Sequence, residues 1–190
     1  MDGLLTPRLM LRRWREADRD VFHRLNSDDV VMRFFPMRRT RLESDAMMDL
    51  VEDRYAREGI GFLALQELST GAVVGMLGAG RLGDHHPFAG AVELGWRLLP
   101  EYWGRGYATE GALASAAACF ETLGVQEVVA QCVVTNEASQ AVMRRIGMTP
   151  AETFAHPDVD PDRFPELVEH RLFRLSRADW QAQRSASSAG

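Results

Sequence analysis

Residues 92–110 read VELGWRLLPEYWGRGYATE, and this stretch decides how the chain is interpreted. Apolar residues alternate from Val92 to Leu98, which predicts a strand. Pro100 cannot donate a hydrogen bond to a sheet, so pairing is expected to stop there. The glycines at 104 and 106 lack a Cβ and let the backbone adopt strained dihedrals. A helix is expected from Tyr107, because the apolar residues that follow recur on one face.

A glycine turn that opens a helix is a site for anions, and phosphate is its usual occupant. The first N–H groups of a helix are unpaired, and the helix dipole places positive charge at the same end. Two well-known phosphate motifs fail here. No Gly-Lys-Ser/Thr tripeptide occurs, which excludes the Walker A loop. The dinucleotide fingerprint requires a small residue where Thr109 stands and an acid at the end of the next strand, whereas Glu127 stands at its start.

The remaining pattern resembles motif A of the GNAT acyl-CoA N-acyltransferases, Gln/Arg-x-x-Gly-x-Gly/Ala. Here it reads Trp103-x-x-Gly106-x-Ala108, and Trp103 departs from the general motif. The longer run Tyr-Trp-Gly-x-Gly-Tyr-Ala-Thr-Glu resembles the RimJ/RimL-like branch, which acetylates the N-termini of ribosomal proteins. The segment from Asn136 to Ser139 and the later Gly147-Met148 resemble motif B, and Arg8-Leu9-x-Leu11-Arg12 resembles the branch's first strand.

The resemblance implies an α/β GNAT fold with a mixed, mostly antiparallel sheet of about seven strands flanked by helices. Its fourth and fifth strands, here 93–99 and 127–134, would splay apart to admit the pantetheine arm of acetyl-CoA. The backbone of the strand end and the amides of the turn would bind this cosubstrate. The implied cofactor-binding residues are Leu98, Leu99, Gly104, Arg105, Gly106, Tyr107, Ala108, Thr109 and Asn136.

Acetyl transfer to an amine needs a base, a donor for the oxyanion and a proton for the leaving thiolate. Glu93 is the candidate base, because burial in an apolar strand would raise its pKa; an outward-facing carboxylate without a role is the alternative. No tyrosine lies between Val134 and Met148, so Ser139 is the candidate acid there. The backbone N–H near Leu98 is the oxyanion donor that the resemblance implies.

Several polar groups in the sequence have two readings. Asn136 is expected to cap a helix, whether or not it also contacts pantetheine. His156 and His170 are alternative bases, although a histidine in a strand is more often structural. The paired histidines at 85–86 lack the neighbours that a metal site requires, so no metal is predicted. Four arginines, Arg33, Arg38, Arg39 and Arg41, lie in the region that covers the acceptor in GNAT proteins. They could bind an acidic substrate or the CoA phosphates, or simply form a solvated face.

Length and composition predict one globular domain over residues 1–182 and a frayed polar tail over 183–190. The formal net charge of −5 argues against a general nucleic-acid binder. No secretory signal or bilayer-spanning run is visible, and Cys119 and Cys132 are expected to be buried thiols, which fits a cytoplasmic protein. A homodimer is a hypothesis based on exposed sheet edges.

The sequence thus predicts an acetyl-CoA-dependent N-acetyltransferase that acts on a primary amine, either a protein N-terminus or a small molecule. The alternative is a GNAT-like module that binds acyl-CoA without turnover. The loops at 32–41, 83–89 and 156–165 would determine specificity.

Overall fold

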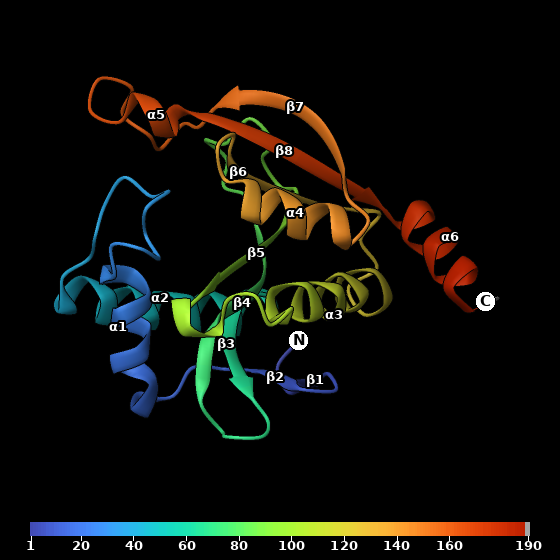
Figure 1. Ribbon diagram of the computed structural model, residues 1–190, viewed down its shortest axis with the longest axis horizontal. Helices are drawn as coiled ribbons and strands as arrows, with labels where there is room; N and C mark the ends of the chain where they lie inside the picture. The colour runs from blue at the N-terminus through green and yellow to red at the C-terminus, as the bar shows by residue number, and fades with distance from the viewer. Residues whose placement is uncertain (189–190) are drawn as a thin grey trace. The chain divides into compact units, whose positions relative to one another are not determined.

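The computed structural model describes residues 1–188 and contains one eight-stranded sheet, ordered β1-β2-β3-β4-β5-β6-β8-β7 (Figure 1). Strands β5 and β6 run parallel, whereas the pairs β1–β2, β2–β3, β3–β4, β6–β8 and β7–β8 are antiparallel. The predicted mixed, mostly antiparallel sheet is therefore confirmed, with eight strands instead of about seven. The strands are β1 (Leu4–Leu5), β2 (Leu9–Arg12), β3 (Phe62–Glu67), β4 (Val73–Arg81), β5 (Val92–Leu98), β6 (Glu127–Val133), β7 (Thr149–Ala155) and β8 (Glu169–Ser176).

Six α-helices and two short 3-10 helices connect the strands of the described chain. They are η1 (Glu16–Asp18), α1 (Arg19–Ser27), α2 (Arg41–Glu58), η2 (Pro100–Tyr102), α3 (Tyr107–Glu121), α4 (Glu137–Arg145), α5 (Pro165–Val168) and α6 (Arg177–Ser188). The chain forms two compact units. Unit 1 comprises Met1–Gly80 and Gly95–Ser115, and unit 2 comprises Arg81–Leu94 and Ala116–Gly190. The predictions of one domain over 1–182 and of splayed strands β5 and β6 stay predictions.

Unit 1 has two apolar clusters. One contains Leu9, Leu63 and Leu77 from neighbouring strands, together with Leu98 and Tyr107. The other contains Leu99 and residues of α1, α2 and the strands, among them Trp14, Phe22, Leu25, Met48 and Ala64. Consecutive residues of a strand point to opposite faces, so the adjacent positions 98 and 99 join different clusters. This alternation gives the end of β5 one side toward α3 and the other toward α1 and α2.

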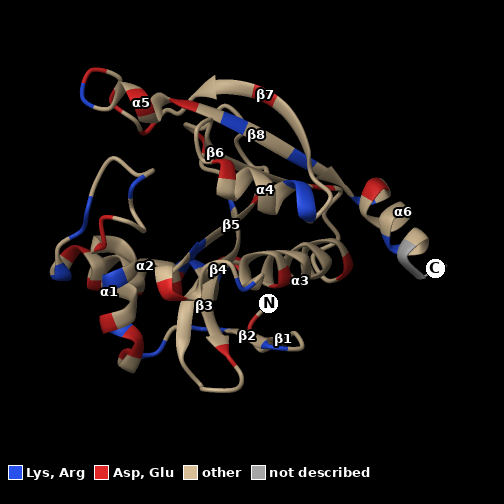
Figure 2. Cartoon of the chain, in the orientation of Figure 1, with Lys and Arg blue, Asp and Glu red and all other residues tan. Residues whose placement is uncertain are grey.

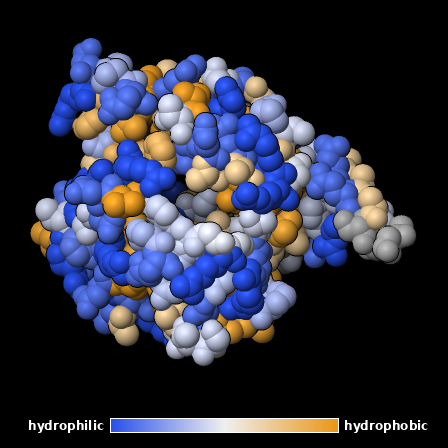
Figure 3. Space-filling view, viewed as in Figure 1, coloured by the Kyte–Doolittle hydropathy of each residue, from blue (hydrophilic) through white to orange (hydrophobic). Residues whose placement is uncertain are grey.

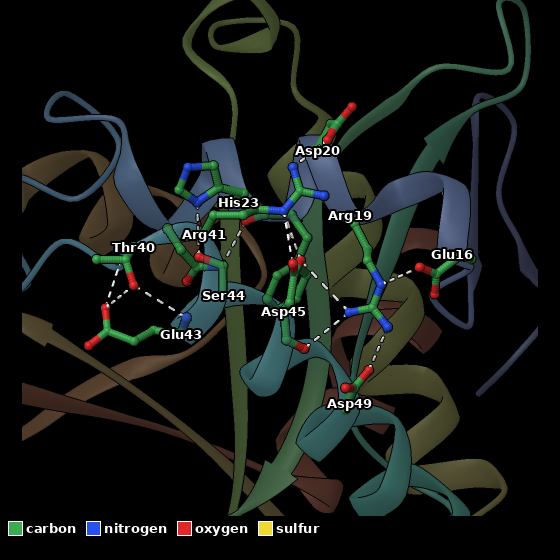
Figure 4. A network of polar contacts seen from close by, with 12 residues as sticks. Glu16, Arg19, Asp20, His23, Thr40, Arg41, Glu43, Ser44, Asp45 and Asp49 are labelled. Atoms are coloured by element: carbon green, nitrogen blue, oxygen red, sulfur yellow. Dashed lines mark hydrogen bonds and ion pairs between the residues drawn. The ribbon is translucent and has the colours of Figure 1, made fainter.

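Helices α1 and α2 of unit 1 both carry acidic and basic residues (Figure 2), and ion pairs join the two helices (Figure 4). Arg19 contacts Glu16 at 2.7 Å and Asp49 at 2.8 Å. Arg41 contacts Asp20 at 2.5 Å and Asp45 at 2.9 Å.

The ends of α2 are fixed by its own sequence. Thr40 accepts a hydrogen bond from the Glu43 amide, and the Glu43 carboxylate accepts one from the Thr40 amide at 2.7 Å, which completes a capping box (Figure 4). Gly59 ends the helix with a φ of 70°, as its glycine predicted.

In unit 2, β6 lies between the first part of β5 and the full length of β8. Its residues Val128, Val129 and Ala130 are buried, which confirms the strand predicted to be covered on both faces. Strands β7 and β8 form a long antiparallel hairpin (Figure 1), with an irregular register between Pro150 and Thr153.

Helix α6 extends further than the sequence suggested. The segment 183–190 was expected to be a frayed tail, but the helix continues to Ser188, and residues 189–190 lie outside the described residues. The helix begins at a cap in which the Asp179 amide donates to the Ser176 hydroxyl at 3.1 Å. Gln183 donates to the Gly147 carbonyl at 3.1 Å, and this tertiary contact holds a polar segment that has no apolar periodicity.

Polar and apolar side chains are interspersed on the face of the molecule shown in Figure 3. Over residues 1–188, none of the helices has the length and apolar character needed to cross a bilayer.

Candidate functional site

The predicted strand–turn–helix stretch lies mainly in unit 1 and has the predicted geometry. Strand β5 ends at Leu98, η2 follows, and α3 begins at Tyr107. Gly104 and Gly106 have φ angles of 73° and 80°, a region that favours glycine. The Glu110 amide donates to the Gly106 carbonyl at 3.0 Å, so the helical hydrogen bonds begin there. The amides before Glu110 are therefore the unpaired N-terminal donors of α3.

Arg8 holds this turn in place through side-chain hydrogen bonds. Its Nη1 donates to the Arg105 carbonyl at 2.9 Å, and its Nε donates to Glu110 Oε2 at 2.7 Å. The Thr6 hydroxyl donates to the same carboxylate at 2.6 Å. Burial alone would raise the pKa of Glu110. The hydrogen bonds from Thr6 and Arg8 together have the larger effect and lower this pKa below its usual value, so the carboxylate stays ionised. The turn is thus attached to the first strands of the sheet by charge-assisted hydrogen bonds, a role of Arg8 that the sequence did not reveal.

The Tyr107 side chain belongs to the scaffold of the turn. Its hydroxyl donates to Glu67 on β3, which also accepts a hydrogen bond from Thr70 at 2.7 Å. These hydrogen bonds, led by that from Tyr107, lower the pKa of Glu67. Arg105 Nη1 lies 3.9 Å from the same carboxylate. The Arg105 charge is therefore partly balanced within the protein.

Some of the backbone N–H and C=O groups of Leu98 and Leu99 already form hydrogen bonds within the protein. The Leu99 amide donates to the Val74 carbonyl at 3.0 Å, and its carbonyl accepts from the Tyr102 amide at 3.0 Å. The Leu98 carbonyl accepts from the Trp103 indole at 2.8 Å. Because alternate residues of a strand point their backbone groups to opposite edges, the Leu98 N–H points away from β4. Of the two residues, Leu98 is therefore the one whose N–H is not bonded to β4.

In unit 2, the Glu93 carboxylate lies beside a glutamine of the adjacent strand. Glu93 pairs with Val129, so Gln131, two residues further along β6, points to the same face of the sheet as Glu93. The Gln131 side chain lies close enough to Glu93 to lower the pKa of its carboxyl group. Gln131 is half-buried and is the polar exception in the apolar run of β6.

His86 orients the Gln131 amide. The Phe88 amide donates to His86 Nδ1 at 3.2 Å, which makes this nitrogen the acceptor of the neutral ring. His86 Nε2 then carries the proton, and it lies 3.2 Å from Gln131 Oε1. Because the amide oxygen accepts from His86, the amide NH₂ group is left to donate to Glu93. The sequence did not predict this series of contacts from His86 through Gln131 to Glu93, although a single glutamine in an apolar strand was a visible signal.

Burial raises the pKa of Glu93 to about 7, against the opposing effect of the hydrogen bond from Gln131. A carboxyl group with such a pKa is divided between its acid and base forms near neutral pH, which suits proton transfer. The structure therefore favours the buried reading of Glu93 over that of an outward-facing carboxylate.

The two alternative bases, His156 and His170, lie together with their ring centroids 4.5 Å apart. Burial lowers the pKa of both, that of His156 to about 4, so they are neutral at physiological pH. His85 is exposed and lies 3.2 Å from Asp158. No group of three or more potential metal ligands is present within residues 1–188.

Asn136 caps α4 as predicted, since its side-chain oxygen accepts from the Ser139 amide at 3.2 Å. Ser139 lies in the first turn and is partly exposed. Their contacts with a cosubstrate and the role of Ser139 as an acid stay predictions, as do those of Glu93 and the glycine turn.

Comparison with known proteins identifies the family. The profile described as "Acetyltransferase (GNAT) domain" matches residues 8–149. The chain belongs to the GNAT family. An acyl-CoA-dependent N-acetyltransferase is the class of enzyme that this membership indicates. The mixed sheet with flanking helices is the GNAT fold.

Individual relatives agree with this GNAT assignment. The chain is 38% identical over 95 residues to FsC-acetyl coenzyme A-N(2)-transacetylase of Aspergillus fumigatus, a match that covers 50% of this chain and 40% of that protein. An acetyltransferase structure from Agrobacterium tumefaciens has a TM-score of 0.76 and 27% identity, covering 93% of this chain and 95% of its own. Spermidine N-acetyltransferase of Vibrio cholerae, solved with CoA and spermine, has a TM-score of 0.73 at 13% identity over 93% of this chain and 99% of its own. At that identity, only the fold is comparable.

Proposed function

We propose that this GNAT protein transfers an acetyl group directly from acetyl-CoA to a primary amine, without a covalent enzyme intermediate. The observation that carries the proposal is the half-buried Glu93 carboxyl, which lies beside Gln131 and has a pKa of about 7. Such a group removes a proton from an ammonium or an attacking amine and remains available at neutral pH.

The amides of residues 105–109 fit the pyrophosphate of acetyl-CoA. They precede or open α3, and Gly104 and Gly106 give the turn the positive φ angles that it requires. Arg8 holds the turn through the Arg105 carbonyl. Leu98, Leu99 and Asn136 are the proposed contacts of the pantetheine arm, with Leu98 N–H as the main donor from the strand.

The reaction forms a C–N bond and breaks the C–S bond of the thioester. Glu93 accepts the proton of the attacking amine, directly or through water, since only a neutral amine has a free lone pair. The Leu98 N–H donates to the carbonyl oxygen as negative charge develops on it. Ser139 provides a proton to the departing sulfur and recovers one from solvent, so that CoA leaves as a thiol.

The acceptor is a primary amine, either a protein N-terminus or a small molecule. The motif resemblance supports the RimJ/RimL-like branch. A cytoplasmic location and a homodimer are parts of the same proposal. Sedimentation at several protein concentrations tests the dimer.

Calorimetric titration with acetyl-CoA tests the cosubstrate site, with ATP and NAD as controls. Selective binding with a Kd near 1 μM corresponds to about −8 kcal/mol and is readily measured. A screen of amines for acetylated product, followed by mass spectrometry, then tests turnover. Binding without any acetylated product, unchanged in Glu93→Gln and Ser139→Ala, favours the alternative of a non-catalytic acyl-CoA-binding module. A folded protein that does not bind acetyl-CoA contradicts both readings.

A further inference from the structure

Unit 1 contains a half-buried arginine without a carboxylate partner. Arg97 on β5 donates through Nη1 to Asn26 Oδ1 at 2.7 Å and to the Leu25 carbonyl at 3.3 Å. Its Nε is buried and has no hydrogen-bond partner. Within residues 1–188, no ion pair joins Arg97 to a carboxylate, and the nearby charge of Arg39 is also positive. Removing a cation from water costs free energy that a partner anion recovers, so this unmatched charge indicates a ligand.

The free groups of Arg97 have the geometry that a carboxylate requires. Because Nη1 donates to the protein, Nε and Nη2 remain as one edge of the planar guanidinium. Two parallel N–H donors on such an edge bind the two oxygens of a carboxylate. The Phe35 ring lies over the flat face of the guanidinium, with Arg97 Cζ 4.2 Å from the ring centroid. Phe35 is 39% exposed and forms a cover at the surface over the guanidinium, whose Nε is itself buried.

Arg39 adds a second positive charge. Its amide donates to the Asn26 carbonyl at 2.9 Å, which places Arg39 beside the residue whose side chain holds Arg97. Burial, reinforced by the positive charge of Arg39, lowers the pKa of Arg97 to about 10, and the guanidinium stays charged at neutral pH. Two like charges around one asparagine repel each other, and an anion between them would remove the repulsion.

The neighbouring arginines behave differently. Arg38 contacts Asp29 at 2.9 Å, and Arg41 contacts Asp20 and Asp45 (Figure 4). Their charges are matched within the protein, which supports the solvated-face reading for these two. Arg33, the remaining member of the predicted group, lies over the Phe34 and Trp103 rings. Arg39 is the member whose backbone is bonded to Asn26, and the structure adds Arg97, which that group did not include.

We propose that Arg97 and Arg39 form a carboxylate-binding subsite for the acceptor, so that the preferred substrates are amines that also carry a carboxylate. Arg39 and the cover residue Phe35 lie in the segment 32–41, which is expected to cover the acceptor in GNAT proteins. The inference rests on the proposed acetyl transfer and gives the acceptor a chemical class.

Matched pairs of acceptors test the preference. The first set compares the ω-amino acids β-alanine, 4-aminobutyrate and 6-aminohexanoate with their primary amides. The second compares short C-terminally amidated peptides with glutamate or glutamine at their second position. In the wild-type protein, the best carboxylate acceptor should have a kcat/KM about tenfold or more above that of its amide. In Arg97→Gln, this ratio should fall to below about threefold, and Arg39→Gln should give an intermediate ratio.

Arg38→Gln is the matched control for Arg39→Gln. It removes the same charge from the segment 32–41, but from an arginine that is already paired with Asp29. It should keep the wild-type ratio. Equal rates for carboxylates and amides, or an unchanged ratio in Arg97→Gln, would overturn the inference while leaving acetyl transfer to amines intact. A loss of acetyl-CoA affinity in Arg97→Gln without a change in acceptor preference would instead assign the arginines to a CoA phosphate, which also overturns it.

A second measurement does not depend on turnover. Glutarate should raise the Tm of the wild-type protein above that measured in sodium chloride of equal ionic strength, because a ligand of the folded state stabilises it. The rise should be absent in Arg97→Gln and reduced in Arg97→Lys, which keeps the charge but not the two-donor edge. No specific rise in the wild-type protein, or an equal rise in Arg97→Gln, refutes the subsite. If acetyl-CoA does not bind at all, the proposed function fails separately.

Discussion

Replacing Glu93 by glutamine should stabilise the protein at high pH while it abolishes catalysis. The pKa of Glu93 is raised from 4.5 to about 7 in the folded protein. Between these two values the folded state binds more protons than the unfolded state, so the contribution of Glu93 to the free energy of unfolding falls as pH rises. This contribution is fully present below pH 4.5 and is lost as pH passes through 7.

The magnitude follows from the two pKa values. At 1.36 kcal/mol for each pH unit, the difference between 4.5 and about 7 corresponds to about 3 kcal/mol. Glu93 is partly exposed, and solvent screening reduces the expected effect to about 1–3 kcal/mol. Glutamine has the same shape and no charge, and its oxygen still accepts from Gln131. The Glu93→Gln variant should therefore exceed the wild-type protein in stability by this amount at pH 8.5 and by less at pH 5.

Urea denaturation at pH 5 and pH 8.5 measures this difference, and Glu169→Gln, a change at an exposed residue of β8, is the control. Acetyl transfer by the wild-type protein should rise with pH through about 7 as Glu93 loses its proton. The facing groups on the loop before β5 and on β6 are His86 and Gln131, both neutral at that pH. A stability difference between Glu93→Gln and the wild-type protein that is the same at both pH values would refute the buried-carboxyl reasoning. Full activity of Glu93→Gln would refute its role as the base.

Three further changes test the rest of the site. Gly106→Val forces a β-branched residue to a φ of 80° and places its Cβ 3.4 Å from Arg8 Nη2, so it should distort the turn and abolish acetyl-CoA binding in calorimetry. Arg105→Ala should change the Kd by less than about threefold, and normal affinity in Gly106→Val would contradict the turn assignment. Gln131→Leu removes a hydrogen bond that favours ionised Glu93, so the rise of the pH–rate profile should move to higher pH, and an unmoved profile would show that Gln131 does not position the base. Arg8→Gln breaks the charged contacts that hold the turn and should raise the Kd for acetyl-CoA by about tenfold, measured by the same titration; an unchanged Kd would show that the turn keeps its shape without this side chain.

The sequence predicted best what depends on neighbouring residues. The glycine turn, the Asn136 cap and the end of α2 at Gly59 all follow from local backbone preferences, and the structure contains them. The buried strand over 127–133 was visible as an apolar run. Strand β1 was missed, because its two residues are too few to show a period.

Contacts between distant segments were not predictable in the same way. The Glu93–Gln131 pair depends on the register of two strands that are separated by α3, and no local pattern fixes that register. Arg97 looked like an ordinary polar residue of a strand, and its missing counter-ion became visible only once Asn26 and Arg39 were placed beside it. Helix α6 likewise depends on the contact between Gln183 and Gly147.

Both cysteines, Cys119 and Cys132, are buried free thiols, as the sequence suggested. Burial raises the pKa of each to about 11, so at pH 8 only about one in a thousand of these groups is a reactive thiolate. Disulfide reagents that develop colour with free thiols should therefore leave the folded protein almost untouched. Any colour that appears during turnover therefore comes from released CoA. The reaction can be followed continuously at a high enzyme concentration, at which the acetylation of poor acceptors becomes fast enough to measure.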